Sequence, residues 1–152
     1  MALAAPPGPP PNAATVQATL AAIDGRGIVH LSAHGHHEQD NVLFSRLDLV
    51  DGPLMAYDIH QLAAAPAHVV LSSCDVGRAV VRAGDELLGF TAALLYGGTR
   101  SVVSSASRVA DDVAIKVMST YHRALASGVQ PARALADAAA SEPLVSFVCF
   151  GG

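Results

Sequence analysis

The hydrophobic pattern of the chain alternates between short apolar runs and longer stretches with apolar residues at helical spacing. The short runs have turn signals at their ends, which is typical of strands buried on both faces, and they cover residues 28–33, 67–73, 100–105 and 144–150. The helical patterns cover residues 13–23, 57–65, 85–96, 109–127 and 131–140. This alternation predicts an α/β fold, a three-layer α/β/α sandwich around a mostly parallel sheet.

Two segments fall outside this alternation. Residues 1–12 are rich in proline, which favours neither helices nor sheet ladders, so they are predicted to be a disordered tail before one domain at 13–152. In the segment 36–56, the apolar groups at 42–44 and 47–50 and the turn residues at 51–53 predict a small β-hairpin.

Composition narrows the class of protein. The chain has 152 residues, of which 51% are hydrophobic and 14% charged, so a packed domain is expected rather than a disordered chain. The net charge of −4 and the lack of a basic patch argue against a nucleic-acid partner. No apolar run approaches the roughly 18 residues of a membrane span, and residues 1–12 do not resemble a signal peptide. Two cysteines make no disulfide framework, and a cytoplasmic location is expected.

The first two predicted strands each end near a residue with catalytic potential, His34 and Cys74. In parallel sheets, functional residues lie just beyond the carboxyl ends of strands, so neighbouring strands would bring this histidine and cysteine together. Histidine can take the thiol proton and create the nucleophilic thiolate. The backbone N–H groups of Gly35 and Cys74 are candidates for an oxyanion hole.

Other interpretations of these residues compete with catalysis. A lone Cys74 could be a buried structural thiol, and Cys149, among aromatic residues, is expected in the core. The histidines inside strands, His30 and His68, are expected to be hydrogen-bonded groups of the core or near the site, whereas His60 and His122 are expected on helix surfaces.

A metal site is a weaker alternative. Three histidines and two acidic residues cluster at 34–40, but the sequence has no H-E-x-x-H or C-x-x-C spacing. We therefore expect neither a metal nor a cofactor.

Several segments together resemble the CHAT domain, a bacterial branch of the caspase-like cysteine peptidases (clan CD) that is related to separase. Residues 28–35, IVHLSAHG, resemble its H-x-x-x-H-G block, and residues 69–77, VVLSSCDVG, resemble its cysteine block. The helix start GDELLGF, the junction LYGGTRSVV and the last helical pair and closing strand are also similar. The resemblance runs from about Ala14 to the end of the chain.

The resemblance implies that His34 is the general base and Cys74 the nucleophile, while His30 is the first, non-catalytic histidine of its block. It implies a cysteine endopeptidase that acts on a peptide or protein substrate through an acyl-enzyme. Separately from the resemblance, the acidic residues Asp75, Asp85 and Glu86 lie near the cysteine in sequence, so they are candidates for a substrate pocket that favours a basic side chain. The alternative for Asp85 and Glu86 is a helix cap and a solvated first turn.

The sequence departs from the family pattern in two ways. Val76 stands where threonine is frequent, and the first two strands of the caspase-like sheet have no counterpart before the histidine strand. The domain would then be partial, with an exposed edge on that strand. Three explanations are open: the chain is a fragment of a longer protein, a partner chain or a second copy covers the edge, or the chain is a degraded relative of the family. A catalytically inactive interaction or scaffold module is therefore the alternative function.

Overall fold

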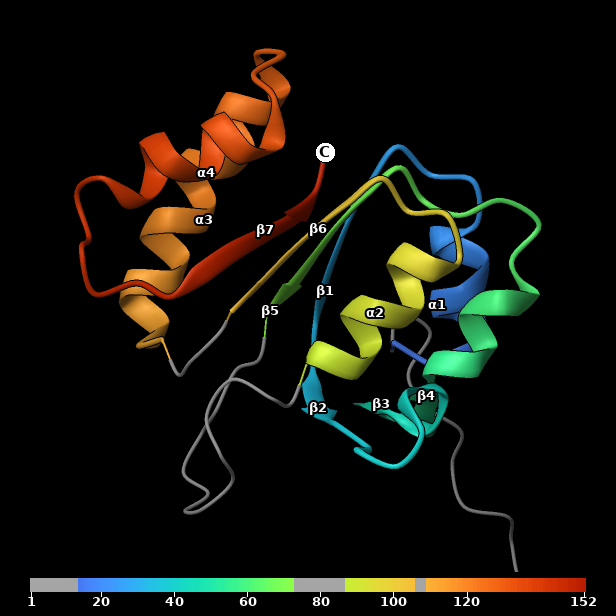
Figure 1. Ribbon diagram of the computed structural model, residues 1–152. Helices are drawn as coiled ribbons and strands as arrows, with labels where there is room; N and C mark the ends of the chain where they lie inside the picture. Colours follow the sequence, from blue (N-terminus) through green and yellow to red (C-terminus); the bar gives the residue numbers. More distant parts are fainter. Residues whose placement is uncertain (1–13, 73–86, 106–108) are drawn as a thin grey trace, which may run out of the picture.

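Four strands form the central sheet, in the order β1-β5-β6-β7 (Figure 1). The computed structural model describes residues 14–72, 87–105 and 109–152. Strands β1, β5 and β6 run parallel, whereas β7 runs antiparallel to β6. The four strands are β1 (Ile28–Ser32), β5 (His68–Ser72), β6 (Ser101–Ser105) and β7 (Phe147–Gly151). The α/β class and the mostly parallel sheet predicted from the sequence are confirmed.

Helices cover both faces of this sheet and make two separate cores. The first contains α1 (Val16–Ile23), the 3-10 helix η2 (Ala56–Gln61) and α2 (Leu88–Tyr96). The second contains α3 (Asp111–Ala126) and α4 (Pro131–Ala139), which lie on the other side in Figure 1. Alternate residues of β5 serve the two cores, because Val69 and Leu71 pack into the first and Val70 into the second.

Local sequence signals explain where these helices begin. Thr15 caps α1, because its hydroxyl accepts a hydrogen bond from the Ala18 N–H at 3.2 Å. Pro131 occupies the first turn of α4, where its missing N–H costs nothing. Asp111 and Asp112 lie in the first turn of α3, where the helix dipole favours negative charge.

The segment between β1 and β5, called the excursion below, differs from the predicted hairpin. A three-stranded antiparallel sheet is formed by β2 (His34–His36), β3 (Arg46–Leu49) and β4 (Gly52–Met55). The hairpin is therefore present, but its strands are displaced from the prediction. Residues 42–44 are the 3-10 helix η1 (Val42–Phe44), because the Asn41 side chain accepts a hydrogen bond from the Leu43 N–H and begins a turn there.

Two predicted elements are several residues shorter than expected. The pattern at 57–65 is 3-10 rather than α-helical and ends at Gln61, since Leu62 is extended and Pro66 disfavours helical geometry in the residue before it. The last strand begins at Phe147, because Glu142 and Val145 take part in a turn. The predicted helix at 85–96 is observed as α2 from Leu88, and residues 85 and 86 lie outside the described residues.

One small residue allows the excursion to dock on the main domain. A Cβ atom on Gly89 of α2 would lie 1.9 Å from the Ser45 hydroxyl oxygen and 2.6 Å from Nδ1 of His37. The Ser45 hydroxyl is fully buried there and accepts a hydrogen bond from the Glu38 N–H. Because position 89 is glycine, the segment after His34 that carries His37 and Ser45 can pack directly against α2.

Strand β1 is the outer strand of the sheet in the described part of the chain, with no strand beyond it. One of its faces packs Val29 and Leu31 against the first core. The other face carries Ile28, which is 53% exposed, together with His30 and Ser32. Helices α3 and α4 therefore cover β5, β6 and β7 more completely than they cover β1.

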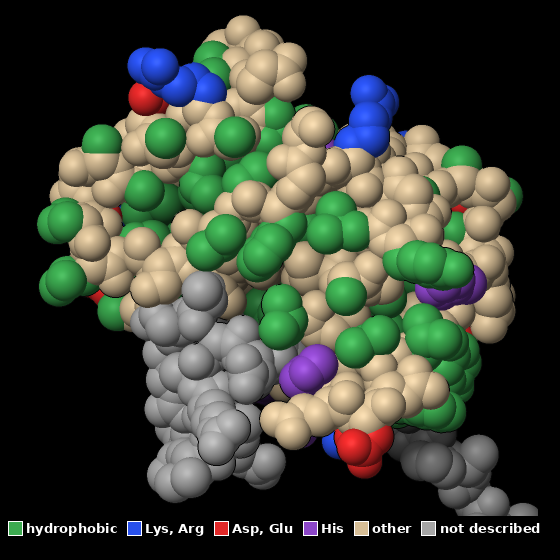
Figure 2. Space-filling view, in the orientation of Figure 1, with side chains coloured by type: hydrophobic (Ala, Val, Ile, Leu, Met, Phe, Trp, Pro, Cys, Tyr) green, Lys and Arg blue, Asp and Glu red, His purple; other side chains and the backbone are tan. Residues whose placement is uncertain are grey.

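Apolar side chains also gather on the face formed by α2 and the two 3-10 helices (Figure 2). Phe44 and Tyr57 are 54% and 43% exposed, and their rings meet edge to face at 6.1 Å. Membrane insertion of a helix is not indicated, because none in the described residues combines the necessary length and apolarity.

Candidate active site

The carboxyl ends of β1 and β5 lie side by side at one rim of the sheet. Ser32 and Ser72 are register partners at the ends of these strands, and the Ala33 N–H donates to the Ser72 carbonyl at 3.1 Å. Beyond this pair, His34 follows Ser32 by two residues and Cys74 follows Ser72 by two residues. Cys74 lies outside the described residues, as do Asp75, Asp85 and Glu86.

His34 begins β2 and has an exposed side chain. Gly35, the next residue, is buried opposite Leu47 of β3, so this part of the backbone is held against the domain. His36 is exposed again, because side chains alternate along a strand. The backbone thus holds His34 at the rim while leaving its imidazole accessible.

The hairpin surface beside His34 carries a small group of charged residues. Asp48 is the register partner of His34, but its carboxylate is bonded elsewhere. It accepts a hydrogen bond from Nε2 of His36 at 2.9 Å and lies 3.5 Å from Nε of Arg46. No third residue of a catalytic triad is therefore assigned to His34.

Three hydrogen-bonded side chains, His122, His30 and Ser72, connect α3 to β1 and β5 near this rim. Nδ1 of His30 lies 3.0 Å from Nε2 of His122, and the two rings stack with centroids 5.0 Å apart. Nε2 of His30 lies 2.9 Å from the Ser72 hydroxyl. Burial and the nearby His122 lower the pKa of His30, and burial lowers the pKa of His122.

Sequence analysis missed the role of His122, which was expected on a helix surface. It is only half-buried, but its ring fills the space between α3 and the outer strand β1. The signal available in the sequence was its position directly after Tyr121 of the apolar stripe of α3. That signal was insufficient, because it does not show that β1 is an edge strand within reach of the helix.

Another histidine of the core, His68, connects β5 to β6 and α3. Its Nδ1 lies 2.7 Å from the Ser101 hydroxyl and 3.1 Å from the Ser101 carbonyl oxygen. Its Nε2 lies 2.7 Å from the Tyr121 hydroxyl. His68 is buried, and burial lowers its pKa. The expectation that it is a hydrogen-bonded core residue is confirmed.

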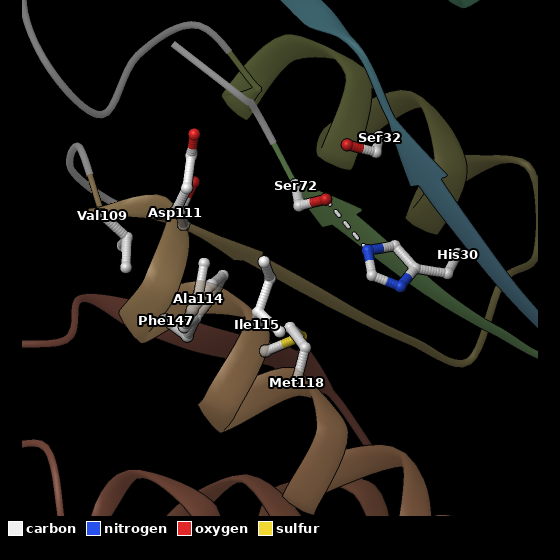
Figure 3. A pocket seen from close by; sticks show the side chains of 10 residues that line it. His30, Ser32, Ser72, Val109, Asp111, Ala114, Ile115, Met118 and Phe147 are labelled. Atoms are coloured by element: carbon white, nitrogen blue, oxygen red, sulfur yellow. Dashed lines mark hydrogen bonds between the residues drawn. The ribbon is translucent and has the colours of Figure 1, made fainter. Parts of the chain in front are cut away.

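A pocket of about 300 Å³ opens at this rim between the ends of the strands and α3 (Figure 3). Its polar wall comes from the strands and carries His30, Ser32, Ser72 and Ser105. Its apolar wall comes from α3 and its neighbours and carries Val109, Ala114, Ile115, Met118 and Phe147, with Asp111 beside them. A site of this kind suits an apolar side chain oriented by a few polar groups.

The second cysteine has a different environment from the rim. Cys149 lies in β7, half-buried against the second core, and burial raises the pKa of its thiol. A thiol that resists ionisation is a poor nucleophile, in agreement with its expected place in the core. Within the described ranges, no three His, Cys, Asp or Glu side chains group in a way that could hold a metal ion.

Comparison with known proteins identifies the family. The sequence model of the CHAT domain matches residues 9–142, which is most of the chain. No curated protein matches the chain. The match includes His34, Cys74 and all the strands except β7. The chain belongs to the CHAT domain family, whose fold is caspase-like.

Proposed function

We propose that the protein is a cysteine endopeptidase with Cys74 as nucleophile and His34 as general base. The observation that supports this most directly is the register of β1 and β5. Ser32 and Ser72 are partners, and His34 and Cys74 each follow two residues later in the sequence. Neighbouring strands are about 4.8 Å apart, so equal offsets from a register pair favour close approach of the two side chains. The caspase-like family supports the same assignment.

In the proposed reaction, His34 takes up a proton and releases it twice, once in acylation and once in deacylation. Its imidazole takes the thiol proton of Cys74, and the thiolate attacks the peptide carbonyl to form a C–S bond. The backbone N–H groups of Gly35 and Cys74 stabilise the negative oxygen of the tetrahedral intermediate. The imidazolium then protonates the leaving amine as the C–N bond breaks. Water, deprotonated by His34, then attacks the acyl carbonyl. The C–S bond breaks, the carboxylic acid product leaves, and the imidazolium returns its proton to the thiolate of Cys74.

The pocket at the rim is the proposed place for a substrate side chain. Ser72 lies in its wall and precedes the nucleophile by two residues, so a side chain in the pocket would be close to the bond that is cleaved. The apolar wall from α3 favours leucine, methionine or phenylalanine there. The competing hypothesis, a basic side chain recognised by Asp75, Asp85 and Glu86, predicts cleavage next to arginine or lysine instead.

The decisive experiment is labelling of Cys74 by a thiol-directed peptide probe, with the labelled residue identified by mass spectrometry. His34→Ala is expected to abolish labelling, because the thiol then lacks its base. His36→Ala is the matched control, since it removes an exposed histidine two residues away on the same strand. Loss of labelling only in His34→Ala supports the peptidase. Equal labelling of wild type and His34→Ala would show an ordinary exposed thiol and overturn the proposal.

A non-catalytic interaction module is the second candidate function. The observation that favours it is the outer edge of β1, which is unpaired within the described residues and carries the exposed Ile28. Such an edge can pair with a strand of another chain. The same labelling experiment separates the two functions, because a scaffold has no need for His34-dependent reactivity of Cys74.

A further inference from the structure

The hydrogen-bonded histidine pair on the α3 face of β1 is not used by the proposed reaction. His30 comes from β1, His122 from α3 and Ser72 from the end of β5, so three separate elements meet in one chain of hydrogen bonds. Figure 3 shows the His30 ring directed at Ser72 across the mouth of the pocket. This arrangement links the helix to the strand that leads to the nucleophile.

The hydrogen bonds among His122, His30 and Ser72 limit how many protons the two rings can carry. A neutral imidazole has one donor and one acceptor nitrogen, so one ring must donate to the other across the 3.0 Å distance. The other nitrogen of His30 then bonds to the Ser72 hydroxyl with the complementary role. If both rings were protonated, two N–H groups would face each other and the bond between the rings would be lost. The connected arrangement therefore needs at least one neutral ring.

Ser72 is held at two points as a result. Its carbonyl accepts the Ala33 N–H of the neighbouring strand, and its hydroxyl is bonded to His30. It is also the last residue of β5, two residues before Cys74. If the Ser72 backbone could move, the position from which the chain continues to Cys74 would move with it.

We propose, on the basis of the proposed peptidase function, that His30 and His122 are positioning residues that fix the carboxyl end of β5 through Ser72. They do not touch the reacting atoms. They restrict the strand end from which the nucleophile continues, and they do so while the pair has a neutral ring. This proposal explains the H-x-x-x-H spacing. The first histidine, His30, anchors the end of β5, and the second, His34, four residues later, acts as the base.

Several ionisable groups surround this pair in the described structure. From α3, Tyr121 meets the His122 ring edge to face at 5.6 Å, and Asp111 lines the same pocket as His30. From β5, His68 is bonded to the Tyr121 hydroxyl, and from β7, Cys149 lies in the same core as that tyrosine. The nearest partner of His30 that can carry a positive charge is thus His122, which disfavours protonation of the His30 ring.

The test uses the rate at which iodoacetamide alkylates Cys74 in a Cys149→Ala background, measured by mass spectrometry from about pH 5 to about pH 8. At neutral pH, His30→Leu and Ser72→Ala are each expected to slow alkylation about tenfold, the effect of losing one well-placed hydrogen bond. His30→Gln, whose amide can replace the bond to Ser72, is expected to restore most of the rate. His60→Gln, on the exposed surface of η2, is the matched control and keeps the wild-type rate.

The pH profile separates positioning from general structural damage. In the wild type, the rate should fall on acidification with the steepness of more than one proton, because protonation of the histidine pair adds to the loss of the reactive thiolate. In His122→Gln the extra steepness should disappear, since no second ring remains to disrupt the pair. Circular dichroism checks that each variant is folded. If His30→Leu does not fold, the test is made with Ser72→Ala and His122→Gln.

The possible results distinguish this inference from the proposed function. If His34→Ala abolishes alkylation while His30→Leu, Ser72→Ala and His122→Gln all keep the wild-type rate and profile, the peptidase stands and the positioning role is wrong. If His34→Ala reacts like the wild type, the peptidase proposal itself fails and the positioning role falls with it.

Discussion

The Asp48 carboxylate is bonded to His36, although its register partner across β2 and β3 is His34. The distance from Nε2 of His36 to Oδ2 of Asp48 is 2.9 Å, and Arg46 lies on the other side of the carboxylate. Both members of the His36–Asp48 pair are about half exposed. Exposed pairs of this kind contribute little to stability because water screens them. The acidic residue opposite the proposed base is therefore a surface group rather than a third catalytic residue.

Replacing Asp48 should accordingly leave the reactivity of the site intact. We expect Asp48→Asn to alkylate Cys74 within about twofold of the wild-type rate and to lower the free energy of unfolding by less than about 1 kcal/mol. The measurements are the iodoacetamide rate and urea unfolding. A large loss of Cys74 reactivity with unchanged stability would instead make Asp48 a partner of His34.

The close contact at Gly89 predicts a substitution that damages the fold near the site. In Gly89→Ala, the new methyl group would collide with the buried Ser45 side chain and with His37, so the excursion must move away from α2. We expect a loss of about 2 kcal/mol in the free energy of unfolding, as for other overpacked positions. Urea unfolding measures it.

Gly27→Ala is the matched control for this substitution. An added Cβ at Gly27 meets nothing within 4 Å, so the same chemical change should leave stability nearly unaltered. Equal destabilisation by both substitutions would mean that backbone freedom of glycine, and not the contact with Ser45, is responsible.

The strands could be predicted from the sequence because their signals are local. The run ending at Ser72 contains three consecutive apolar residues, Val69 to Leu71, and such unbroken apolar stretches are typical of strands buried on both faces. The long helix α3 carries its acidic first turn and its apolar stripe within its own residues. By contrast, the turn at Val42 begins where the Asn41 side chain accepts a hydrogen bond from the Leu43 N–H, and an apolar pattern cannot reveal it.

The candidate site was predicted only as far as it depends on strand ends. His34 follows a strand in sequence and lies at the rim of the sheet in the structure. The bond between His30 and His122 joins residues 92 positions apart, so it depends on how far α3 extends toward β1. The pocket likewise depends on the packing of α3 against three strand ends, which periodicity does not specify.

The neutral histidines predict how stability depends on pH. In the folded protein the pKa values of His30, His68 and His122 are lowered, mainly by burial. In the unfolded chain they return to about 6.5, so the unfolded state binds more protons as the pH falls through that value. The contribution of these residues is fully present above about pH 6.5 and is lost progressively below it. We expect the melting temperature to fall between about pH 8 and about pH 5.5.

Substitution of one member should reduce this dependence. His122→Gln removes one lowered pKa and relieves His30 of its charged neighbour, so the melting temperature should change less over the same pH range. His60→Gln, at an exposed position, should retain the wild-type slope. An unchanged slope in His122→Gln would mean that His122 already takes up its proton in the folded state as easily as in the unfolded chain.

The pocket predicts the selectivity of the proposed peptidase. Ala114 lies in its apolar wall on α3, and a phenylalanine there would occupy much of a space of about 300 Å³. We expect Ala114→Phe to slow labelling of Cys74 by a probe with a leucine side chain about tenfold or more, because that side chain loses its site. Labelling by iodoacetamide, which has no side chain to place, should stay at the wild-type rate.

The two probes together make this prediction specific. Ala126→Phe, at the exposed end of the same helix, is the matched control and should affect neither probe. If Ala114→Phe slowed both probes alike, the substitution would have disturbed the rim itself rather than a side-chain pocket. If it slowed neither, the leucine side chain must bind elsewhere. A wild-type preference for arginine or lysine probes would then favour Asp75, Asp85 and Glu86, because opposite charges, rather than an apolar wall, would select the substrate.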